Sequence, residues 1–342
     1  MPGIFILPGN TFFNRRFCYM PSSINSDYNN DINSWSEIER QIANIAKAGF
    51  THIQWIHDWE GDYQYNKSEI YHVRDMLRHY GLNAHTLHSS EGGVRTVKKP
   101  DGTGVFRNRY RLTTDIRKDY TSTTEFIRLA GVELLRNRID LCAAIGAKVM
   151  VLHLQLPYKM FEENEQDKND YFAQVYKSLD ALKPYAEVAG VKIAMENLIC
   201  TPVHHQEDSF DRLFDRYDFG FLGFCYDSGH ASLHCRNDYY YFLKKYNTRL
   251  IACHLQDTNS ISDELAEDDW QILKHDLHAV PFSGGVLDWE KVAELVATAP
   301  LDLPADFEVV FSGKTPEEEF AKLEDCRKKA ELFHDKVLSY KK

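Results

Sequence analysis

Three features of the amino-acid sequence predict an α/β protein built as one parallel barrel. Short apolar strands alternate with amphipathic helices, a pattern typical of parallel βα units. Eight such strands are present, and 342 residues are enough for a barrel of about 250 residues with insertions. No linker rich in Pro, Gly or Ser divides the chain. We therefore expect a single (β/α)8 TIM barrel over residues 1–342. An open Rossmann-type sheet is the alternative, although no G-x-G-x-x-G motif follows a strand.

The strands are recognised as short apolar runs, many of which end in a polar residue. In chain order they are expected at residues 3–7, 51–57, 83–88, 147–153, 192–197, 222–227, 249–255 and 303–309.

Capping residues mark several of the helices between these strands. Ser34 and Glu37 have the spacing of a capping box, and the helix that they open is expected to stop near Gly49. A second box at Ser122 and Glu125 is expected to open a helix that ends at Gly146. Further helices are expected at about residues 168–190, 207–217, 237–247 and 288–297.

Three segments depart from a minimal barrel. Residues 92–111 alternate like a β-hairpin and hold six Lys or Arg residues against one acid. We expect the whole insertion, 92–120, to be an active-site arm or lid that supplies cations to an anionic substrate, or a solvated or subunit-contacting arm. The acidic segment 161–170 is expected to be a surface loop. An extra helix at 315–340 begins with an N-cap Thr and a Pro in the first helical position.

The composition excludes several classes of protein. Hydrophobic residues make up 43% of the chain, which argues against disorder. The net charge of −11 repels phosphates, so we expect neither nucleic acid nor a membrane surface as a partner. There is no apolar run of about 18 residues, and the N-terminus lacks the basic and apolar regions of a signal peptide. Seven scattered cysteines without a C-x-x-C pair favour a reducing, cytoplasmic location.

Four residues with metal-binding side chains end four consecutive predicted strands. They are Glu196, Asp227, His254 and Glu308. Because the carboxyl ends of barrel strands open into one mouth, these side chains are expected to meet there. Three carboxylates and one imidazole suit a divalent cation such as Mn²⁺, Mg²⁺ or Co²⁺. The sequence therefore predicts a metal site at this mouth.

Further polar and aromatic residues are expected around the same pocket. His88 and His153 end the third and fourth strands, and His230 lies three residues after Asp227. Asp276 and His278 form a D-x-H pair after the seventh strand. Each of them alone is as well explained by a core or capping role. Together they are expected to bind substrate, as are two residues at the end of the second strand, Trp55 and His57.

Several of these segments resemble one known superfamily. They are KVMVLHL, KIAMENL, GFCYDSGHA, IACHLQD and ADFEVV. Over about residues 35–311 the chain resembles the xylose-isomerase-like TIM barrels (AP endonuclease family 2), and most closely their sugar phosphate isomerase/epimerase branch. The resemblance implies one metal ion held by Glu196, Asp227, His254 and Glu308. It also implies that His230 binds substrate or a second metal.

The resemblance further implies a reaction. Glu196 and Glu308 would face each other across a sugar or sugar derivative and move the proton α to its carbonyl through a metal-stabilised enediolate. The result is isomerisation or epimerisation. The same site could perform β-elimination, as in dehydratases and the catalytic subunits of C-glycoside-cleaving enzymes. We expect Mn²⁺ as the cofactor, with Co²⁺, Mg²⁺ and Zn²⁺ as alternatives, and a homo-oligomer.

One departure from the branch concerns the residues after His254. Ketose 3-epimerases carry an arginine there, whereas this chain continues LQDTNSISDELAEDD. Ketose 3-epimerase activity itself is therefore not expected. The acidic loop 257–269 points to a different substrate shape or to a small partner subunit.

Two other functions stay open. In the abasic-site DNA endonuclease branch nine ligands hold three zinc ions, and residues of suitable type occur here in the same order. They are His88, His153, Glu196, Asp227, His230, His254, Asp276, His278 and Glu308. The negative net charge opposes this reading. A non-catalytic sugar-binding subunit is the second possibility, and it predicts that no metal is bound.

Overall fold

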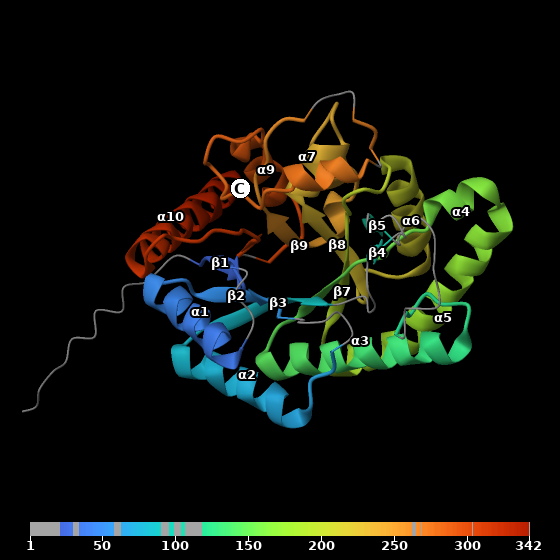
Figure 1. The fold of residues 1–342 in the computed structure, drawn as a ribbon, viewed down its shortest axis with the longest axis horizontal. Coiled ribbons are helices and arrows are strands. Elements are labelled where there is room, and N and C mark those ends of the chain that lie inside the picture. Colours follow the sequence, from blue (N-terminus) through green and yellow to red (C-terminus); the bar gives the residue numbers. More distant parts are fainter. Residues whose placement is uncertain are drawn as a thin grey trace, which may run out of the picture.

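The computed structural model describes residues 21–29, 34–57, 63–89, 96–98, 104–106, 118–261, 265–267, 269–302 and 304–341. Within them, eight parallel strands close into a barrel, and helices cover its outside (Figure 1). Around the barrel the order is β1-β10-β9-β8-β7-β6-β3-β2. The strands are β1 (Ser23–Asn25), β2 (His52–Trp55), β3 (Asn83–Ser89), β6 (Val149–Leu152), β7 (Lys192–Glu196), β8 (Leu222–Asp227), β9 (Leu250–Leu255) and β10 (Asp306–Phe307). The predicted (β/α)8 TIM barrel is confirmed.

Helices connect the strands, and most lie where the sequence predicts them. The longer ones are α1 (Trp35–Ala48), α2 (Lys67–Tyr80), α3 (Glu125–Ile145), α5 (Glu165–Ala189), α6 (Val203–Arg216), α9 (Trp289–Ala297) and α10 (Pro316–Tyr340). The short ones are α4 (Tyr158–Glu163), α7 (Ser228–His234) and α8 (Tyr241–Lys245), with 3-10 helices η2 (Asn247–Arg249) and η3 (Trp270–His275).

The caps predicted at both ends of the chain are confirmed. Ser34 accepts a hydrogen bond from the backbone nitrogen of Glu37 at the start of α1, and Gly49 ends that helix with φ at +95°. Thr315 accepts from the nitrogen of Glu318 in the first turn of α10, the extra C-terminal helix.

The prediction of the first barrel strand at residues 3–7 is wrong. Those residues lie outside the described part of the chain, and β1, at residues 23–25, closes the barrel between β10 and β2. This strand, Ser-Ile-Asn, is short and mostly polar, so it has no apolar run by which a strand is recognised in a sequence. The Ser23 hydroxyl donates to Asp306 across to β10, and Thr86 donates to the other oxygen of that carboxylate at 2.6 Å. A buried polar network therefore helps to hold the strand that the hydrophobic pattern misses.

Two predictions about helix starts are also wrong. Residues 161–170 do not form a loop, because α4 and the first turn of α5 occupy them, and the Asn164 side chain caps α5. The capping box at Ser122 does not form either. The Ser122 hydroxyl accepts from the nitrogen of Thr124, and Glu125 binds Arg128 at 2.7 Å. That ion pair uses the carboxylate that a capping box needs.

The insertion after β3 contains the predicted hairpin. Strands β4 (Thr96–Lys98) and β5 (Gly104–Phe106) pair antiparallel, with Val97 opposite Val105. The turn between them, the basic side chains of the arm and residues 107–117 lie outside what the structure describes. Its use as a lid stays a prediction.

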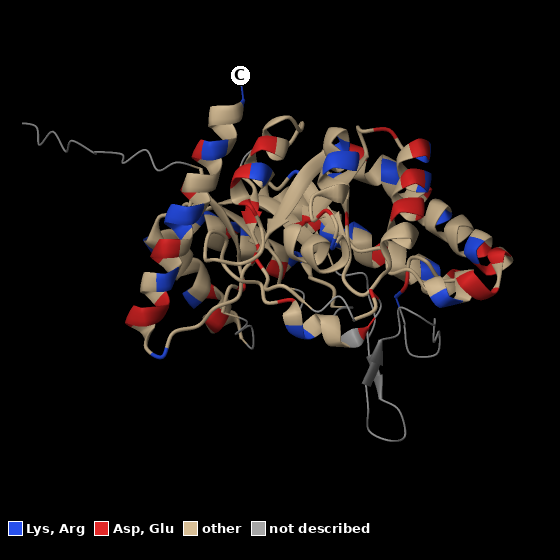
Figure 2. Ribbon diagram, turned by 90° about the horizontal axis from the view of Figure 1, so that it is seen from above, with Lys and Arg blue, Asp and Glu red and all other residues tan. Residues whose placement is uncertain are grey.

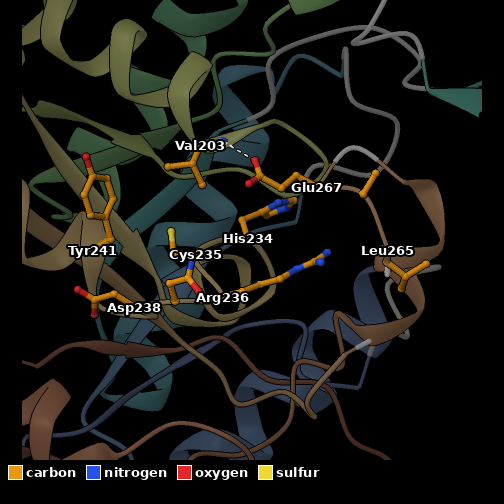
Figure 3. A pocket seen from close by; sticks show the side chains of 10 residues that line it. Val203, His234, Cys235, Arg236, Asp238, Tyr241, Leu265 and Glu267 are labelled. Atoms are coloured by element: carbon orange, nitrogen blue, oxygen red, sulfur yellow. Dashed lines mark hydrogen bonds between the residues drawn. The ribbon is translucent and has the colours of Figure 1, made fainter. Parts of the chain in front are cut away.

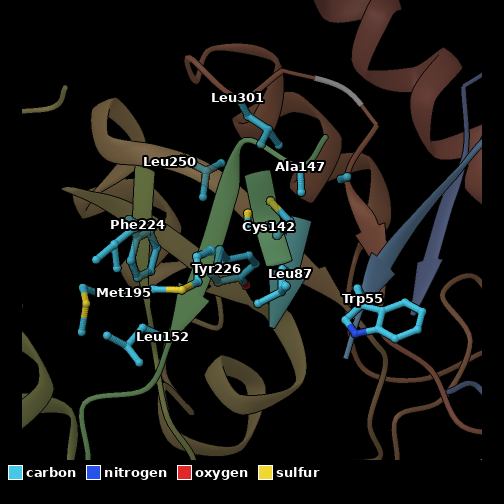
Figure 4. Packing of buried hydrophobic residues seen from close by; sticks show 14 of the residues in the cluster. Trp55, Leu87, Cys142, Ala147, Leu152, Met195, Phe224, Tyr226, Leu250 and Leu301 are labelled. Carbon is cyan, nitrogen blue, oxygen red and sulfur yellow. The ribbon is translucent and has the colours of Figure 1, made fainter. Parts of the chain in front are cut away.

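The pleat of the strands separates two kinds of surroundings. Because successive side chains point to opposite faces, Ala194 and Cys225 share the inner face with Glu196 and Asp227. Met195, Phe224 and Tyr226 point outward into the large apolar core beneath the helices (Figure 4). The polar residues at the strand ends therefore point to the inside of the barrel, and the large apolar core lies between the outer face of the barrel and the helices.

The outer helices carry both signs of charge, and Figure 2 shows Lys and Arg interspersed with Asp and Glu along them. Among the helices that the structure describes, none has the length and hydropathy needed to cross a bilayer.

Candidate metal centre

Four side chains meet at the carboxyl ends of neighbouring barrel strands. Glu196 ends β7, Asp227 ends β8, His254 lies on β9, and Glu308 follows β10. One ligand atom from each lies within 4.8 Å of all the others, and all four residues are buried. Nδ1 of His254 is 2.6 Å from a Glu308 oxygen and 3.1 Å from a Glu196 oxygen. The grouping predicted from the strand ends is present.

Two more histidines approach the same carboxylate from β3 and β6. Nε2 of His153 is 3.1 Å from Oε2 of Glu196, and Nε2 of His88 is 3.5 Å from the same oxygen. The His88 ring stacks on His254 with 5.3 Å between ring centres. Oε2 of Glu196 therefore lies close to three histidines, His88, His153 and His254.

On the other side of Glu196 lie the remaining predicted residues. His230, in the first turn of α7, places Nδ1 3.3 Å from Oε1 of Glu196 and Nε2 3.6 Å from Asp276. His278 lies 3.4 Å from the same Asp276 oxygen. It has φ at +45°, a left-handed conformation that is uncommon for histidine. Asp276 and His278 thus lie next to His230 in the same cluster, and the backbone of His278 has a left-handed conformation there.

Amide side chains that the sequence reasoning missed hold these carboxylates. Gln256 donates from Nε2 to both oxygens of Asp227, at 3.3 and 3.2 Å, and to Asp276 at 3.1 Å. Its oxygen accepts from the backbone nitrogen of His278 at 3.0 Å. Asn197 exchanges two hydrogen bonds of 2.9 Å with the backbone of Asp227. Only their positions in the sequence could have indicated this, since Asn197 directly follows Glu196 and Gln256 lies two residues after His254.

Trp55 and His57 lie elsewhere. Trp55 is 1% exposed, and its indole nitrogen donates to the hydroxyl of Tyr65 at 3.4 Å within the apolar core (Figure 4). His57 is also buried and packs edge-on against Trp55. Gln54, one residue before Trp55, points to the opposite, inner face and contacts His254. Substrate contact by Trp55 and His57 stays a prediction, whereas the other nine residues form one connected cluster.

Burial and charge together set the ionisation of the cluster. Burial acts to raise the pKa of Glu308, but the adjacent His254 outweighs it and lowers that pKa to about 2. Burial likewise opposes ionisation of Glu196, yet His254 and His153 hold its pKa well below the usual range. At Asp227 burial dominates and raises the pKa to about 6. Burial works against the charged form of His254, but the surrounding groups, Glu196 and Glu308 among them, raise its pKa well above the ordinary value. The carboxylates therefore attract positive charge to this point.

The donor set fits a divalent cation. Carboxylate oxygens with one imidazole suit hard to borderline ions such as Mg²⁺, Mn²⁺ and Co²⁺. Within the described part of the chain, Nδ1 of His254 has no hydrogen-bond partner, and carboxylate oxygens of Glu308 and Glu196 lie 2.6 and 3.1 Å from it. That lone pair and the carboxylate oxygens beside it are arranged as metal ligands are.

A separate cavity of about 680 Å³ opens at the far end of α7 (Figure 3). Its lining includes His234, Arg236 and Glu267, and Glu267 accepts from the backbone nitrogen of Val203 at the start of α6. His234 accepts from the nitrogen of Cys200 at 2.8 Å, and burial lowers its pKa to about 3. This histidine is therefore a neutral structural acceptor.

Comparison with known proteins agrees with this architecture. The sequence profile described as "Xylose isomerase-like TIM barrel" matches residues 42–326. The uncharacterized protein y4fM of Sinorhizobium fredii is 32% identical over 271 residues, which are 79% of this chain and 80% of that protein. A protein with this barrel and this strand-end cluster belongs to a known class, and the chain is a member of the xylose isomerase-like TIM barrel family.

Solved structures share the fold at low identity. A D-tagatose 3-epimerase-like protein superimposes with a TM-score of 0.62 at 17% identity, covering 93% of this chain and all of its own. A xylose isomerase-like TIM barrel protein from Mycobacterium smegmatis, solved with magnesium, gives 0.60 at 14%, covering 95% and 98%. The 3-keto-D-glucoside 4-epimerase from E. coli gives 0.57 at 13%, covering 92% and 98%.

Proposed function

We propose that this protein is an isomerase or epimerase of a sugar or sugar derivative and that it depends on one divalent cation. Glu196, Asp227, His254 and Glu308 would hold the cation, because their ligand atoms converge within 4.8 Å. The observation that carries the proposal is the pair of buried glutamates beside one imidazole. Glu196 and Glu308 approach the same nitrogen of His254, at 3.1 and 2.6 Å, so two proton-accepting groups adjoin one cation site.

The residues of the cluster supply what proton transfer next to a carbonyl requires. A bound divalent cation would supply positive charge where negative charge develops on the substrate oxygen. The low pKa of Glu308, about 2, keeps this carboxylate ionised at neutral pH, and Glu196 is ionised as well. Either can therefore accept a proton from the carbon α to the carbonyl. A proton returned from the opposite face gives an epimer, and one delivered to the neighbouring carbon gives an isomer.

The histidines around the glutamates can orient the substrate. Nitrogens of His88, His153 and His230 all face Glu196, at 3.1 to 3.5 Å, and these rings can hydrogen-bond to sugar hydroxyls. The fold neighbours support a sugar as the substrate class, since those compared include a 3-keto-D-glucoside 4-epimerase. The magnesium in the mycobacterial neighbour supports a hard divalent cation, and we propose Mn²⁺ as the ion used. β-Elimination at the same site remains the alternative where a leaving group lies β to the carbanion.

One observation favours a second candidate, a zinc-dependent abasic-site DNA endonuclease. All nine donors expected for a three-zinc site lie in one connected cluster, which extends through Glu196, His230 and Asp276 to His278. The net charge of −11 opposes the approach of DNA. We therefore rank this function second. A non-catalytic sugar-binding subunit ranks third, because burying several ionised carboxylates without a cation costs free energy of folding.

The proposal includes a reducing cytoplasm and a homo-oligomer. A reducing location is supported by six cysteines that are buried and form no disulfide within the described part of the chain. They are Cys142, Cys200, Cys225, Cys235, Cys253 and Cys326. The homo-oligomer is to be measured by light scattering, and co-purification of a small partner subunit would extend it.

One experiment separates the functions. The Mn²⁺-loaded protein is incubated in D₂O with a panel of aldoses, ketoses and 3-keto-glycosides, and in parallel with an abasic-site oligonucleotide. We expect deuterium at a carbon α to the carbonyl of one sugar, and uptake slower by about 10²–10⁴-fold with Glu308→Gln. Cleavage of the oligonucleotide without deuterium exchange would instead establish the nuclease, and binding of a sugar without exchange would establish the non-catalytic subunit.

A further inference from the structure

The inner face of β2 carries a glutamine that reaches across the barrel to the candidate metal ligand His254. Gln54 is fully buried, and its amide lies 2.6 Å from Nε2 of His254. Strands β2 and β9 are not neighbours, because β1 and β10 lie between them around the barrel. The contact therefore crosses the barrel interior and joins two strands that share no backbone hydrogen bonds.

The two nitrogens of this histidine have different surroundings. Nδ1 has two carboxylates close to it, with Glu308 at 2.6 Å and Glu196 at 3.1 Å. Nε2 faces the amide of Gln54 at 2.6 Å, and the buried Cys225 thiol also lies close to the ring. A ring nitrogen that binds a cation must present its lone pair, so the other nitrogen carries the proton. If Nδ1 is the ligand, Nε2–H needs an acceptor, and Gln54 is the group in place.

The amide can provide that acceptor by a half-turn about its last side-chain bond. In the arrangement described above, the amide nitrogen faces Nε2, and the oxygen Oε1 has no hydrogen-bond partner. The oxygen and nitrogen of an amide have nearly the same shape, so exchanging them requires no repacking. After the exchange, Nε2–H of His254 donates to Oε1 of Gln54. The lone pair on Nδ1 is then fixed toward Glu196 and Glu308.

We propose that Gln54 is a positioning residue that selects the tautomer of His254 and so presents Nδ1 to the cation. The inference rests on the proposed function, since it assigns the cation to the His254 site. Hydrogen-bond partners of metal-binding histidines typically change metal affinity by about 10–100-fold, which sets the scale expected for Gln54. In this role Gln54 acts through His254, which its amide contacts.

Metal affinity of matched variants tests this role. Gln54→Met keeps the length of the side chain but can neither donate nor accept, whereas Gln54→Glu keeps the acceptor. Gln41→Met is the control, because Gln41 is equally buried but lies on α1, outside the barrel, where it accepts from Asn29. We expect Gln54→Met to weaken Mn²⁺ binding, read from the EPR signal of the free ion, by about 10–100-fold. Gln54→Glu and Gln41→Met are expected to stay within about threefold of the unmodified protein.

A second measurement reports the tautomer directly. In the Mg²⁺-loaded protein, the ring ¹⁵N shifts of His254 are expected to place its proton on Nε2, protected from exchange with water, and Gln54→Met is expected to remove the protection. A proton on Nδ1, unchanged Mn²⁺ affinity in Gln54→Met, or equal weakening in Gln54→Met and Gln54→Glu would overturn the role of Gln54 alone. Absence of any divalent-cation binding by the unmodified protein would overturn both this role and the proposed function.

Discussion

Asp227→Asn separates the role of this residue in the fold from the cation-binding role that we propose for it. Asp227 caps α7, where one of its oxygens accepts from the backbone nitrogen of His230 at 2.7 Å. Asparagine caps helices about as well as aspartate, so this hydrogen bond survives the substitution. The negative charge and one oxygen ligand are lost. We therefore expect a folded protein that has lost most of its affinity for the cation.

The magnitude can be worked out for a thermal-shift assay. A cation present at 100 times its Kd stabilises the folded state by about 2.7 kcal/mol. With an unfolding entropy of about 2.1 cal/mol/K per residue, the 342 residues give a rise in Tm of about 4 °C. If the substitution weakens binding by about 100-fold, the same cation concentration stabilises by only about 0.4 kcal/mol, and the rise falls below about 1 °C.

The assay compares Tm with Mn²⁺ and with EDTA for three proteins. Asp288→Asn is the matched control, because Asp288 caps α9 in the same way but lies on the surface, away from the cluster. We expect the unmodified protein and Asp288→Asn to show the full shift and Asp227→Asn to show almost none. In EDTA, Asp227→Asn should be at least as stable as the unmodified protein, because burial raises the pKa of Asp227 to about 6 and disfavours its charge. A full Mn²⁺ shift in Asp227→Asn would refute the assignment of this residue as a ligand.

Three further predictions concern other parts of the molecule. Glu196→Gln and Glu308→Gln should each lower the rate of α-proton exchange by about 10²–10⁴-fold, measured by deuterium uptake on an active sugar, and unchanged exchange would exclude an acid–base role. Burial lowers the pKa of His234 to about 3. Between about pH 6.5 and pH 3 the unfolded chain therefore binds one more proton than the folded protein, and the free energy of unfolding decreases by about 1.4 kcal/mol for each unit by which the pH is lowered. Urea titrations should show this slope reduced in His234→Gln, and equal slopes would contradict it. Gly131→Ala should destabilise by about 1–3 kcal/mol, since its Cβ would lie 2.2 Å from the backbone nitrogen of Tyr120, and an unchanged denaturation midpoint would disagree.

Local signals explain which parts of the fold could be predicted. The inner strands are apolar, and caps such as Ser34 and Thr315 are short-range hydrogen bonds within one segment. Strand β1 could not be found in this way, because its stability comes partly from contacts such as that between Ser23 and Asp306, 283 residues away. The helix α4 was missed because a single short, charged segment carries too weak a pattern.

The same distinction applies to the candidate site. The convergence of Glu196, Asp227, His254 and Glu308 could be predicted, since the barrel brings the ends of its parallel strands to one mouth. Gln54 and Gln256 could not, because an amide in or after a strand has no signature until its partners are known. Trp55 ends its strand with its side chain in the apolar core, and the pleat brings Gln54 to the inner face instead, so substrate contact by Trp55 stays a prediction.

The most direct test of the central claim is the metal content of the purified protein. Elemental analysis is carried out on the unmodified chain, Asp227→Ala and Asp288→Ala after equilibration with Mn²⁺, Mg²⁺, Co²⁺ and Zn²⁺ and removal of free ions. We predict about one divalent ion per chain in the unmodified protein and Asp288→Ala, and almost none in Asp227→Ala. About three zinc ions per chain would instead support the endonuclease, and a metal-free chain under these conditions would contradict the proposed site.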